Sequence, residues 1–252
     1  MRTVVLTASA GTFSGLGEAL SDLPVLIEEH PLIHFTFPED WTQLDSALER
    51  IESYSAMALT SPRAARAVLD RVRATGIAWG AASLRPVVWA SGPATAAVLE
   101  ETLGPISTAP AGEVGTQGAG ASVAQAMLDA GTTGRVLYPC GESRREELPA
   151  QLRSRGIQVD EVVCYRSVLA GENAARAAAA RASILVVSSP AVAQLLARAC
   201  AQTARPDLLV VGPTTAEAAR ASGWVPSAVA REPTVGALGE CLRTLLMLES
   251  HK

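Results

Sequence analysis

The sequence predicts an α/β fold built from two similar lobes, each organised around a parallel sheet. Short runs that are apolar throughout alternate with segments whose apolar residues follow the helical period. Strands without polar alternation are typical of parallel sheets that helices cover on both faces. In addition, two turn motifs occur twice along the chain in the same order, which indicates an internal repeat.

In chain order, strands are expected at residues 3–7, 56–60, 87–90, 135–138, 184–187 and 208–211. Helices are expected at residues 62–75, 94–103, 122–130, 144–155, 190–201 and 215–222. The strand segments are short and apolar, whereas the helix segments are rich in alanine, leucine and arginine at helical spacing. Pro62 and Pro190 each follow a serine, which suits an N-cap and a first helical residue that needs no N–H donor.

The internal repeat relates the two lobes. Ser61-Pro62 is echoed by Ser189-Pro190, and Gly92-Pro93 is echoed by Gly212-Pro213. A tandem pair of flavodoxin-like halves fits this order. A crossed arrangement, in which the first strand and helix join the last third of the chain, fits equally well. In either arrangement we expect the two lobes to face each other across a cleft, the usual place for a ligand.

The repeated turns are candidate anion sites. Ser61 and Ser189 either cap a helix or precede free backbone N–H groups that bind an anion. The same two interpretations apply to Thr95, Thr214 and Thr215, because a hydroxyl group at a helix start can cap the helix or contact a ligand. The repetition of both turns at matching positions gives the ligand-binding interpretation the same weight as capping.

The sequence contains neither the G-x-G-x-x-G fingerprint nor a Walker A motif, so a dinucleotide or nucleotide cofactor is not expected. Residues 115–120 are rich in glycine but do not follow a strand directly, and we interpret them as a mobile loop. The stretch at residues 137–149 is more specific. Arg144 and Arg145 follow a strand-end turn and could bind a carboxylated ligand. Alternatively, Arg144 pairs with Glu147 on a solvated helix face.

Composition narrows the function classes. With 21 basic and 25 acidic residues the formal net charge is −4, which disfavours a general nucleic-acid coat. Lys252 is the only lysine, so a charged contact to an anion would use arginine. The four cysteines are widely spaced and are interpreted as reduced packing thiols. His30 and His34 flank a proline in a β-rich segment, which disfavours a metal pair. We expect a cytoplasmic protein without metal, signal peptide or membrane span.

Several short motifs occur in a characteristic order and spacing. They are T-S-P-R-A at residues 60–64, G-x-x-T-A at 92–96, P-C-G…R-E…L-P at 139–149, Tyr165, S-P at 189–190, G-P-T-T-A at 212–216 and E-P-T at 232–234. With these motifs the chain resembles uroporphyrinogen-III synthase along essentially its whole length.

The resemblance implies the crossed arrangement. Residues 1–30 and 170–252 would form one discontinuous lobe, and residues 38–162 would form the continuous lobe. Residues 31–37 and 163–169 would be two antiparallel connecting strands.

The resemblance also implies a lyase of haem biosynthesis that uses no metal or organic cofactor. Such an enzyme closes hydroxymethylbilane, a linear tetrapyrrole with acetate and propionate on every ring, to uroporphyrinogen III. Water is lost and the last ring is inverted through a spiro intermediate. Attack at the substituted carbon of that ring is mainly a matter of positioning.

The resemblance also implies site residues, at the positions of this sequence that match the motifs of the family. Tyr165 matches the family tyrosine suggested to assist departure of the hydroxyl group, although it could instead pack at a lobe junction. The substrate-binding residues would be Ser61, Arg63, Thr95, Arg145, Ser189, Thr214 and Thr215, where either arginine could instead hold the fold. Many relatives carry arginine and proline directly after the first strand. Here residues 7–10 read T-A-S-A, and no substrate contact is assigned to them.

The alternative from another class is a non-catalytic, ligand-binding sensor with the same two-lobe fold. The chain shows no DNA-binding helix pair or effector domain, which disfavours that alternative. A nucleotide-using α/β enzyme is disfavoured by the missing phosphate loops. The expected partner is a small-molecule substrate, with no nucleic acid or membrane. A monomer is expected because no large apolar interface is evident.

Overall fold

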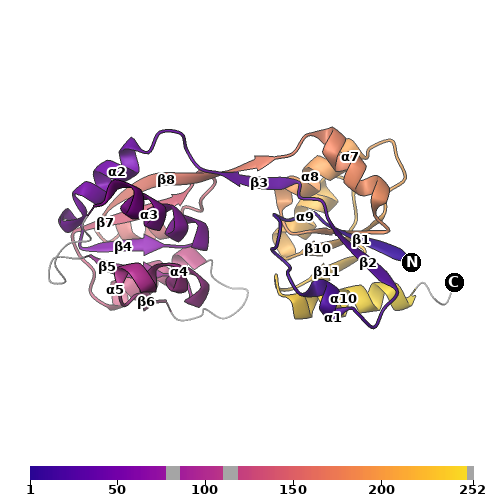
Figure 1. Ribbon diagram of the computed structural model, residues 1–252, viewed down its shortest axis with the longest axis horizontal. Coiled ribbons are helices and arrows are strands. Elements are labelled where there is room, and N and C mark those ends of the chain that lie inside the picture. Colours follow the sequence, from indigo (N-terminus) through magenta and orange to yellow (C-terminus); the bar gives the residue numbers. More distant parts are fainter. Residues whose placement is uncertain (78–85, 110–118, 249–252) are drawn as a thin grey trace. The chain divides into compact units, whose positions relative to one another are not determined.

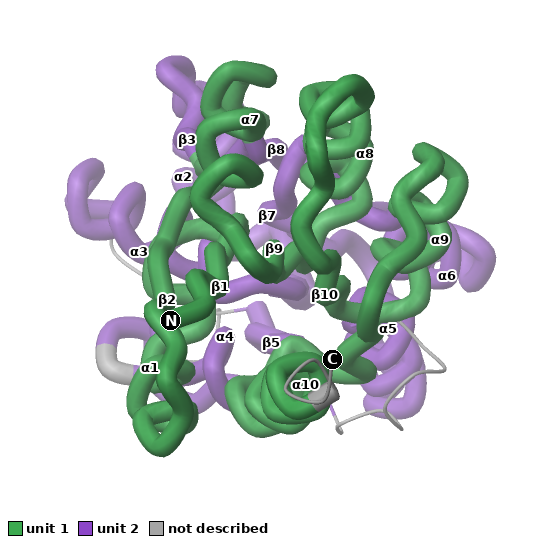
Figure 2. The backbone as a smooth tube through the Cα atoms, turned by 90° about the vertical axis from the view of Figure 1, so that its right-hand side faces the viewer, with its two compact units in different colours: residues 1–35, 168–252 green, residues 36–167 purple. Residues whose placement is uncertain are grey.

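The structure is a computed structural model that describes residues 1–77, 86–109 and 119–248. The chain divides into two compact units, coloured separately in Figure 2. Unit 1 comprises Met1–Phe35 and Val168–Lys252, and unit 2 comprises Thr36–Ser167. Each unit has its own sheet and its own hydrophobic core.

The sheet of unit 1 contains strands from both ends of the chain (Figure 1). Its order is β11 (Ala228–Ala230), β10 (Asp207–Val211), β9 (Ile184–Val187), β1 (Arg2–Leu6) and β2 (Val25–Glu29). The neighbouring strands pair in parallel, and Val5 of β1 lies opposite Leu185 of β9. The first strand therefore joins the last third of the chain, so the structure has the crossed arrangement and not the tandem one.

Helices cover both faces of this sheet. One face carries α7 (Glu172–Arg181), α8 (Pro190–Ala199) and α9 (Pro213–Ala221), and the other carries α1 (Leu16–Ala19) and α10 (Val235–Leu248). Along β1, Val5 packs toward α7–α9, while Val4 and Leu6 pack toward α1 and α10. Because successive side chains point to opposite faces, a strand buried on both sides has to be apolar throughout.

Unit 2 has the same build. Its sheet has the order β3 (Ile33–Thr36), β8 (Gln158–Leu169), β7 (Arg135–Gly141), β4 (Ala56–Leu59), β5 (Val87–Ala90) and β6 (Ser107–Thr108). Helices α2 (Thr42–Glu49), α3 (Pro62–Thr75) and α4 (Pro93–Leu103) cover one face, and α5 (Ala119–Asp129) and α6 (Glu147–Arg153) cover the other. A short 3-10 helix, Ile51–Ser53, follows α2.

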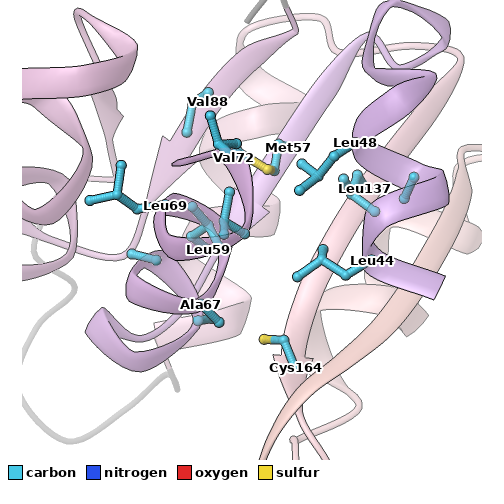
Figure 3. Packing of buried hydrophobic residues seen from close by; sticks show 14 of the residues in the cluster. Leu44, Leu48, Met57, Leu59, Ala67, Leu69, Val72, Val88, Leu137 and Cys164 are labelled. Carbon is cyan, nitrogen blue, oxygen red and sulfur yellow. The ribbon is translucent and has the colours of Figure 1, made fainter. Parts of the chain in front are cut away.

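The core under α2–α4 is drawn in Figure 3, which labels Met57 and Leu59 of β4 and Leu137 of β7 among its buried side chains. Tyr165 packs against this cluster from β8. The chain passes from unit 1 to unit 2 along β3 and returns along β8, and these two strands are neighbours in the sheet.

The predicted α/β class with parallel sheets is confirmed, and several elements match to the residue. Strands β5 and β9 and helix α3 have the predicted bounds. Helices α4 and α9 begin earlier than predicted, at Pro93 and Pro213, because proline is well suited to the first helical position.

The prediction of a helix at residues 144–155 was wrong at its start. Strand β7 extends to Gly141, and the chain then turns, with the Arg144 N–H donating to the Gly141 carbonyl at 3.1 Å. Helix α6 consequently covers Glu147–Arg153 only. Of the glycine-rich stretch predicted as a loop, residues 115–118 lie outside the described residues, and Ala119 and Gly120 begin α5.

The four cysteines are free thiols, as predicted, and Cys140, Cys164 and Cys200 are buried. His30 contacts the Glu28 carboxylate at 3.0 Å. Within residues 1–77, 86–109 and 119–248, no helix has the length and apolar character that a membrane span requires.

Candidate active site

In unit 2, three neighbouring strands end at one edge of the sheet, next to Tyr165 of β8, and the residues at this edge carry the candidate chemistry. Thr60 and Ser61 follow β4, Ser91 follows β5, Gly141 ends β7, and Tyr165 lies on β8. Carboxyl ends of parallel strands are where ligands bind in open α/β sheets. This edge is the candidate active site of unit 2.

Tyr165 and Ser61 meet at this edge although they are far apart in sequence. The Ser61 hydroxyl donates a hydrogen bond to the Tyr165 hydroxyl at 3.2 Å. Between the strands that carry them lies β7, where the ring of Tyr165 passes over Gly141. Tyr165 as a whole is half-buried, and the hydrogen bond from Ser61 holds its hydroxyl group in place.

Ser61 caps a helix and also contacts the candidate catalytic residue. It is the N-cap of α3, and its side-chain oxygen accepts a hydrogen bond from the Ala64 N–H at 3.2 Å. The same hydroxyl group donates to Tyr165, so capping and contact with the candidate catalytic residue occur together. Ser189 is the N-cap of α8 in unit 1, but its side chain makes no capping hydrogen bond.

Arg63 lies in the first turn of α3, close enough to Tyr165 for an electrostatic interaction. Its side chain is exposed at the surface. Partial desolvation lowers the pKa of the Arg63 guanidinium, while Tyr165 acts in the opposite direction. A guanidinium stays protonated at neutral pH, so Arg63 places a positive charge beside the Tyr165 ring.

The threonines of the two Gly-Pro turns occupy equivalent places in the two units. Thr95 of unit 2 and Thr215 of unit 1 are each 3% exposed and lie in the first turn of a helix. The Thr95 hydroxyl lies 3.4 Å from the Ser91 hydroxyl. Thr214, in contrast, is exposed. Gly212, which precedes it, has a φ of 80°, a conformation that favours glycine.

The hydroxyl group of Thr7, directly after β1 in unit 1, forms a hydrogen bond within the fold. Thr7 is fully buried and donates from its side chain to the Val186 carbonyl at 2.8 Å. This bond ties the end of β1 to the neighbouring strand β9.

Arg144 and Arg145 have different partners in the structure. Arg144 binds Glu161 of β8 and Glu146, so its predicted pair with Glu147 was wrong. The solvated pair belongs instead to Arg145, whose side chain is 71% exposed and lies 3.5 Å from Glu147. The reason is the turn before α6, because Arg144 precedes the helix and points across to β8.

Glu161 anchors this turn. Its carboxylate accepts hydrogen bonds from Arg144 and, across 2.8 Å, forms an ion pair with Arg153. Desolvation raises the pKa of Glu161, but the two arginines outweigh it and hold the pKa below the ordinary value of 4.5. The folded state therefore favours the ionised carboxylate.

Replacing Glu161 with glutamine is expected to lower the free energy of unfolding near neutral pH by about 1.5 kcal/mol, because charge-assisted hydrogen bonds are lost. The folded-state pKa lies below the unfolded-state value, so the carboxylate stabilises the fold above pH 4.5 and loses that effect as the pH falls through the lower folded value. Urea unfolding at a series of pH values should show the difference from wild type narrowing on acidification.

The matched control is Glu146→Gln. The Glu146 side chain is 66% exposed and contacts Arg144 at 3.3 Å. Its replacement should cost less than about 0.5 kcal/mol, as exposed ion pairs do. Equal losses in the two variants would contradict the role assigned to Glu161.

Sequence reasoning missed two contributors to this edge. Gly141 lies beneath the Tyr165 ring. Tyr138 of β7 is buried, and its hydroxyl lies 3.1 Å from that of Thr60. A glycine at the end of an extended apolar strand is a recognisable signal of close approach, and it stood within the P-C-G motif. The contact between Tyr138 and Thr60 could not be recognised in the sequence, because it depends only on how β4 and β7 pair. Among the described residues, no three acidic, histidine or cysteine side chains form a group that could hold a metal ion.

The fold defines a class of two-unit α/β protein with parallel sheets, in which ligands bind at the carboxyl ends of the strands. A family model described as uroporphyrinogen-III synthase HemD matches residues 15–240. The chain belongs to the uroporphyrinogen-III synthase family and is an enzyme of tetrapyrrole biosynthesis. This confirms the family and the enzyme class predicted from the motifs.

Solved structures show the same fold. A mutant uroporphyrinogen III synthase from the extremely thermophilic bacterium Thermus thermophilus is 15% identical, with a TM-score of 0.63 and coverage of 100% of both chains. The enzyme from Helicobacter pylori is 19% identical, with a TM-score of 0.59 and coverage of 98% of this chain and 100% of that one. The curated proteins contain no match to the chain.

Proposed function

We propose that this protein closes hydroxymethylbilane to uroporphyrinogen III, with inversion of the last pyrrole ring, and that Tyr165 assists the first step. The family match supports the reaction. The observation that supports the residue is the hydrogen bond between Tyr165 and Ser61 at the carboxyl edge of the unit 2 sheet.

The first step breaks the bond between carbon and oxygen in the hydroxymethyl group. A proton donated to the departing hydroxyl lets it leave as water, and the electron pair of the pyrrole nitrogen forms the azafulvene. The phenol of Tyr165 is the proposed donor. Attack by the substituted carbon of the last ring gives the spiro intermediate, which reopens and closes with that ring inverted. The ring proton lost in the final rearomatisation balances the one that was donated.

Ser61 and Arg63 support the tyrosine in this proposal. Ser61 donates to the phenolic oxygen, which fixes its position. The Arg63 guanidinium lies close enough to Tyr165 for an electrostatic interaction with it. The same guanidinium is suited to binding a substrate carboxylate, because its planar fork matches two carboxylate oxygens.

The remaining proposed contacts hold acetate and propionate groups. Ser189, Thr214 and the N-terminus of α9 in unit 1, and the N-terminus of α4 in unit 2, offer hydroxyl and backbone N–H donors. Thr215 and Thr95 are buried, so we assign them mainly to shaping these helix starts. Arg145 is the weakest of the proposed contacts, because it lies in an exposed ion pair.

Replacing Arg63 with alanine is expected to raise the KM for hydroxymethylbilane by about tenfold, since one charge-assisted carboxylate contact is lost. Arg66 is the matched control, because it is exposed on the same helix. Arg66→Ala should leave KM within about twofold of wild type. Equal KM values for Arg63→Ala and wild type would remove Arg63 from the binding residues.

The reaction itself is tested with a coupled assay. Hydroxymethylbilane is generated in situ, the products are oxidised, and the type I and type III uroporphyrins are separated by chromatography. Predominant type III is expected. A ratio equal to that of spontaneous closure, from protein shown to be folded, would refute the synthase activity and favour a non-catalytic binding protein.

We further propose that the protein acts as a monomer in the cytoplasm, without nucleic-acid or membrane partners. The net charge of −4 supports the absence of a nucleic-acid partner. Sedimentation at micromolar concentration should give the mass of a single chain, and a dimer mass would overturn the monomer.

A further inference from the structure

The Tyr165 side chain lies on the opposite face of the sheet from the one that regular alternation along β8 would predict. On β8, Val159 packs with the α5 and α6 cluster, whereas Val162 and Cys164 pack with the α2–α4 cluster. Side chains alternate along a regular strand, so the residue after Cys164 should point toward α5 and α6. Tyr165 instead packs against the α2–α4 cluster, on the same side as Cys164.

A bulge in β8 produces this change of side. Cys140 of β7 pairs with Val163, and the next residue, Gly141, pairs with Tyr165. Cys164 is therefore an extra residue on β8, and such a bulge breaks the alternation of side chains. Two contacts hold it. Cys164 donates from its sulfur to the Cys140 carbonyl at 3.3 Å, and the Glu142 N–H donates to the Tyr165 carbonyl at 3.0 Å.

Gly141 provides the space that the turned ring occupies. A Cβ atom at this position would lie 2.6 Å from Cζ, 2.7 Å from Cε2 and 2.9 Å from the hydroxyl oxygen of Tyr165. The requirement is steric, because Gly141 is not among the glycines with positive φ. Neighbouring strands lie about 4.8 Å apart, so the ring has to cross β7 directly over Gly141 to reach Ser61 beyond it.

We propose that Gly141 is a positioning residue, which together with the Cys164 bulge sets the side and the reach of the Tyr165 hydroxyl. The bulge turns the ring toward α3, and the missing side chain lets it extend across β7 to the Ser61 hydroxyl. The kinetic consequence rests on the proposed function, which assigns Tyr165 to the reaction. The geometry does not depend on that assignment, so it is tested separately.

The geometric test uses nuclear magnetic resonance of isotope-labelled tyrosine rings. The chain has three tyrosines, so Tyr165→Phe identifies the Tyr165 signal by its disappearance. Gly141→Ala should shift the Tyr165 ring signals while those of Tyr54 stay in place. Gly171→Ala is the control, because a Cβ there meets nothing within 4 Å. An unshifted Tyr165 signal in Gly141→Ala would overturn the proposal.

The kinetic test is a double-mutant cycle. Gly141→Ala should lower kcat by the same factor as Tyr165→Phe, with KM within about twofold of wild type. The double variant should be no slower than either single one, because both changes remove the same group from the reaction. Gly171→Ala should retain wild-type kcat. A double variant slowed by the product of the two factors would refute an action of Gly141 through Tyr165.

A folding test covers the case in which Gly141→Ala does not fold. Removing the ring with Tyr165→Ala should restore a folded protein in the Gly141→Ala background, since the new methyl group would meet open space. Failure of that rescue would show that the clash does not involve Tyr165, and would overturn the proposal. If Tyr165→Phe has wild-type kcat, the catalytic assignment fails, while the ring signals and the rescue still decide the role of Gly141.

Discussion

Replacing Tyr165 with phenylalanine is expected to slow formation of the type III product by about tenfold, less than the roughly hundredfold or more that a general acid typically contributes. The modest factor follows from the substrate, because an azafulvene forms from a pyrrolic hydroxymethyl group without much help. The phenyl ring keeps its place over Gly141 and against the core of unit 2. The loss is therefore chemical, and circular dichroism should show an intact fold.

Tyr54→Phe is the matched control for this variant. The Tyr54 hydroxyl donates to Asp160 at 2.7 Å within unit 2, away from the strand ends that carry the candidate site. Its loss should leave kcat at the wild-type value in the coupled isomer assay. A Tyr165→Phe enzyme as fast as Tyr54→Phe would remove the phenol from the reaction.

Replacing Leu59 with alanine is expected to lower the free energy of unfolding by about 3 kcal/mol, within the range for leucine deletions in cores. Leu59 is fully buried on β4, directly before the Thr60-Ser61 turn, and packs in the cluster under α3 (Figure 3). The removed methyl groups leave a cavity that the surrounding close-packed side chains fill only in part. Urea unfolding measures the loss.

Leu26→Ala is the control for burial. Leu26 lies on strand β2, at the edge of the unit 1 sheet, and is 40% exposed. It has less apolar surface to lose, so its replacement should cost less than about 1 kcal/mol. Hydrogen exchange should place the weakened amides of Leu59→Ala in unit 2. Comparable losses in both variants would show that the Leu59 cluster is not the core that supports this edge.

Local chemistry made much of the fold predictable. The strands at β5 and β9 were predicted to the residue because each is apolar throughout and flanked by turn residues. The start of α3 was predicted because Ser61 and Pro62 suit the last residue before a helix and the first within it. These signals act over a few residues and need no knowledge of the partner strands.

The candidate site was predictable as a set of residues but not as an arrangement. Ser61, Arg63 and Tyr165 were identified from the family motifs, and the structure brings them to one edge of unit 2. Arg145 was identified from the same motifs, yet it lies in an exposed ion pair. The difference depends on the turn after β7, which points Arg144 to Glu161 and leaves Arg145 in solvent.

The sequence by itself determined the α/β class, the repeat of two similar halves, the positions of the turns and the family. Two features had no signal in the repeat or in the local sequence patterns, and the tertiary structure shows them directly. The repeat fitted tandem and crossed arrangements alike; the family resemblance implied the crossed one, and the pairing of β1 with β9 confirms it. The side chain of Tyr165 would face α5 and α6 in a regular strand, and the pairing of β7 with β8 turns it toward α3. Both features depend on hydrogen bonds between strands that are distant along the chain, and such pairing leaves no periodic signal within either strand.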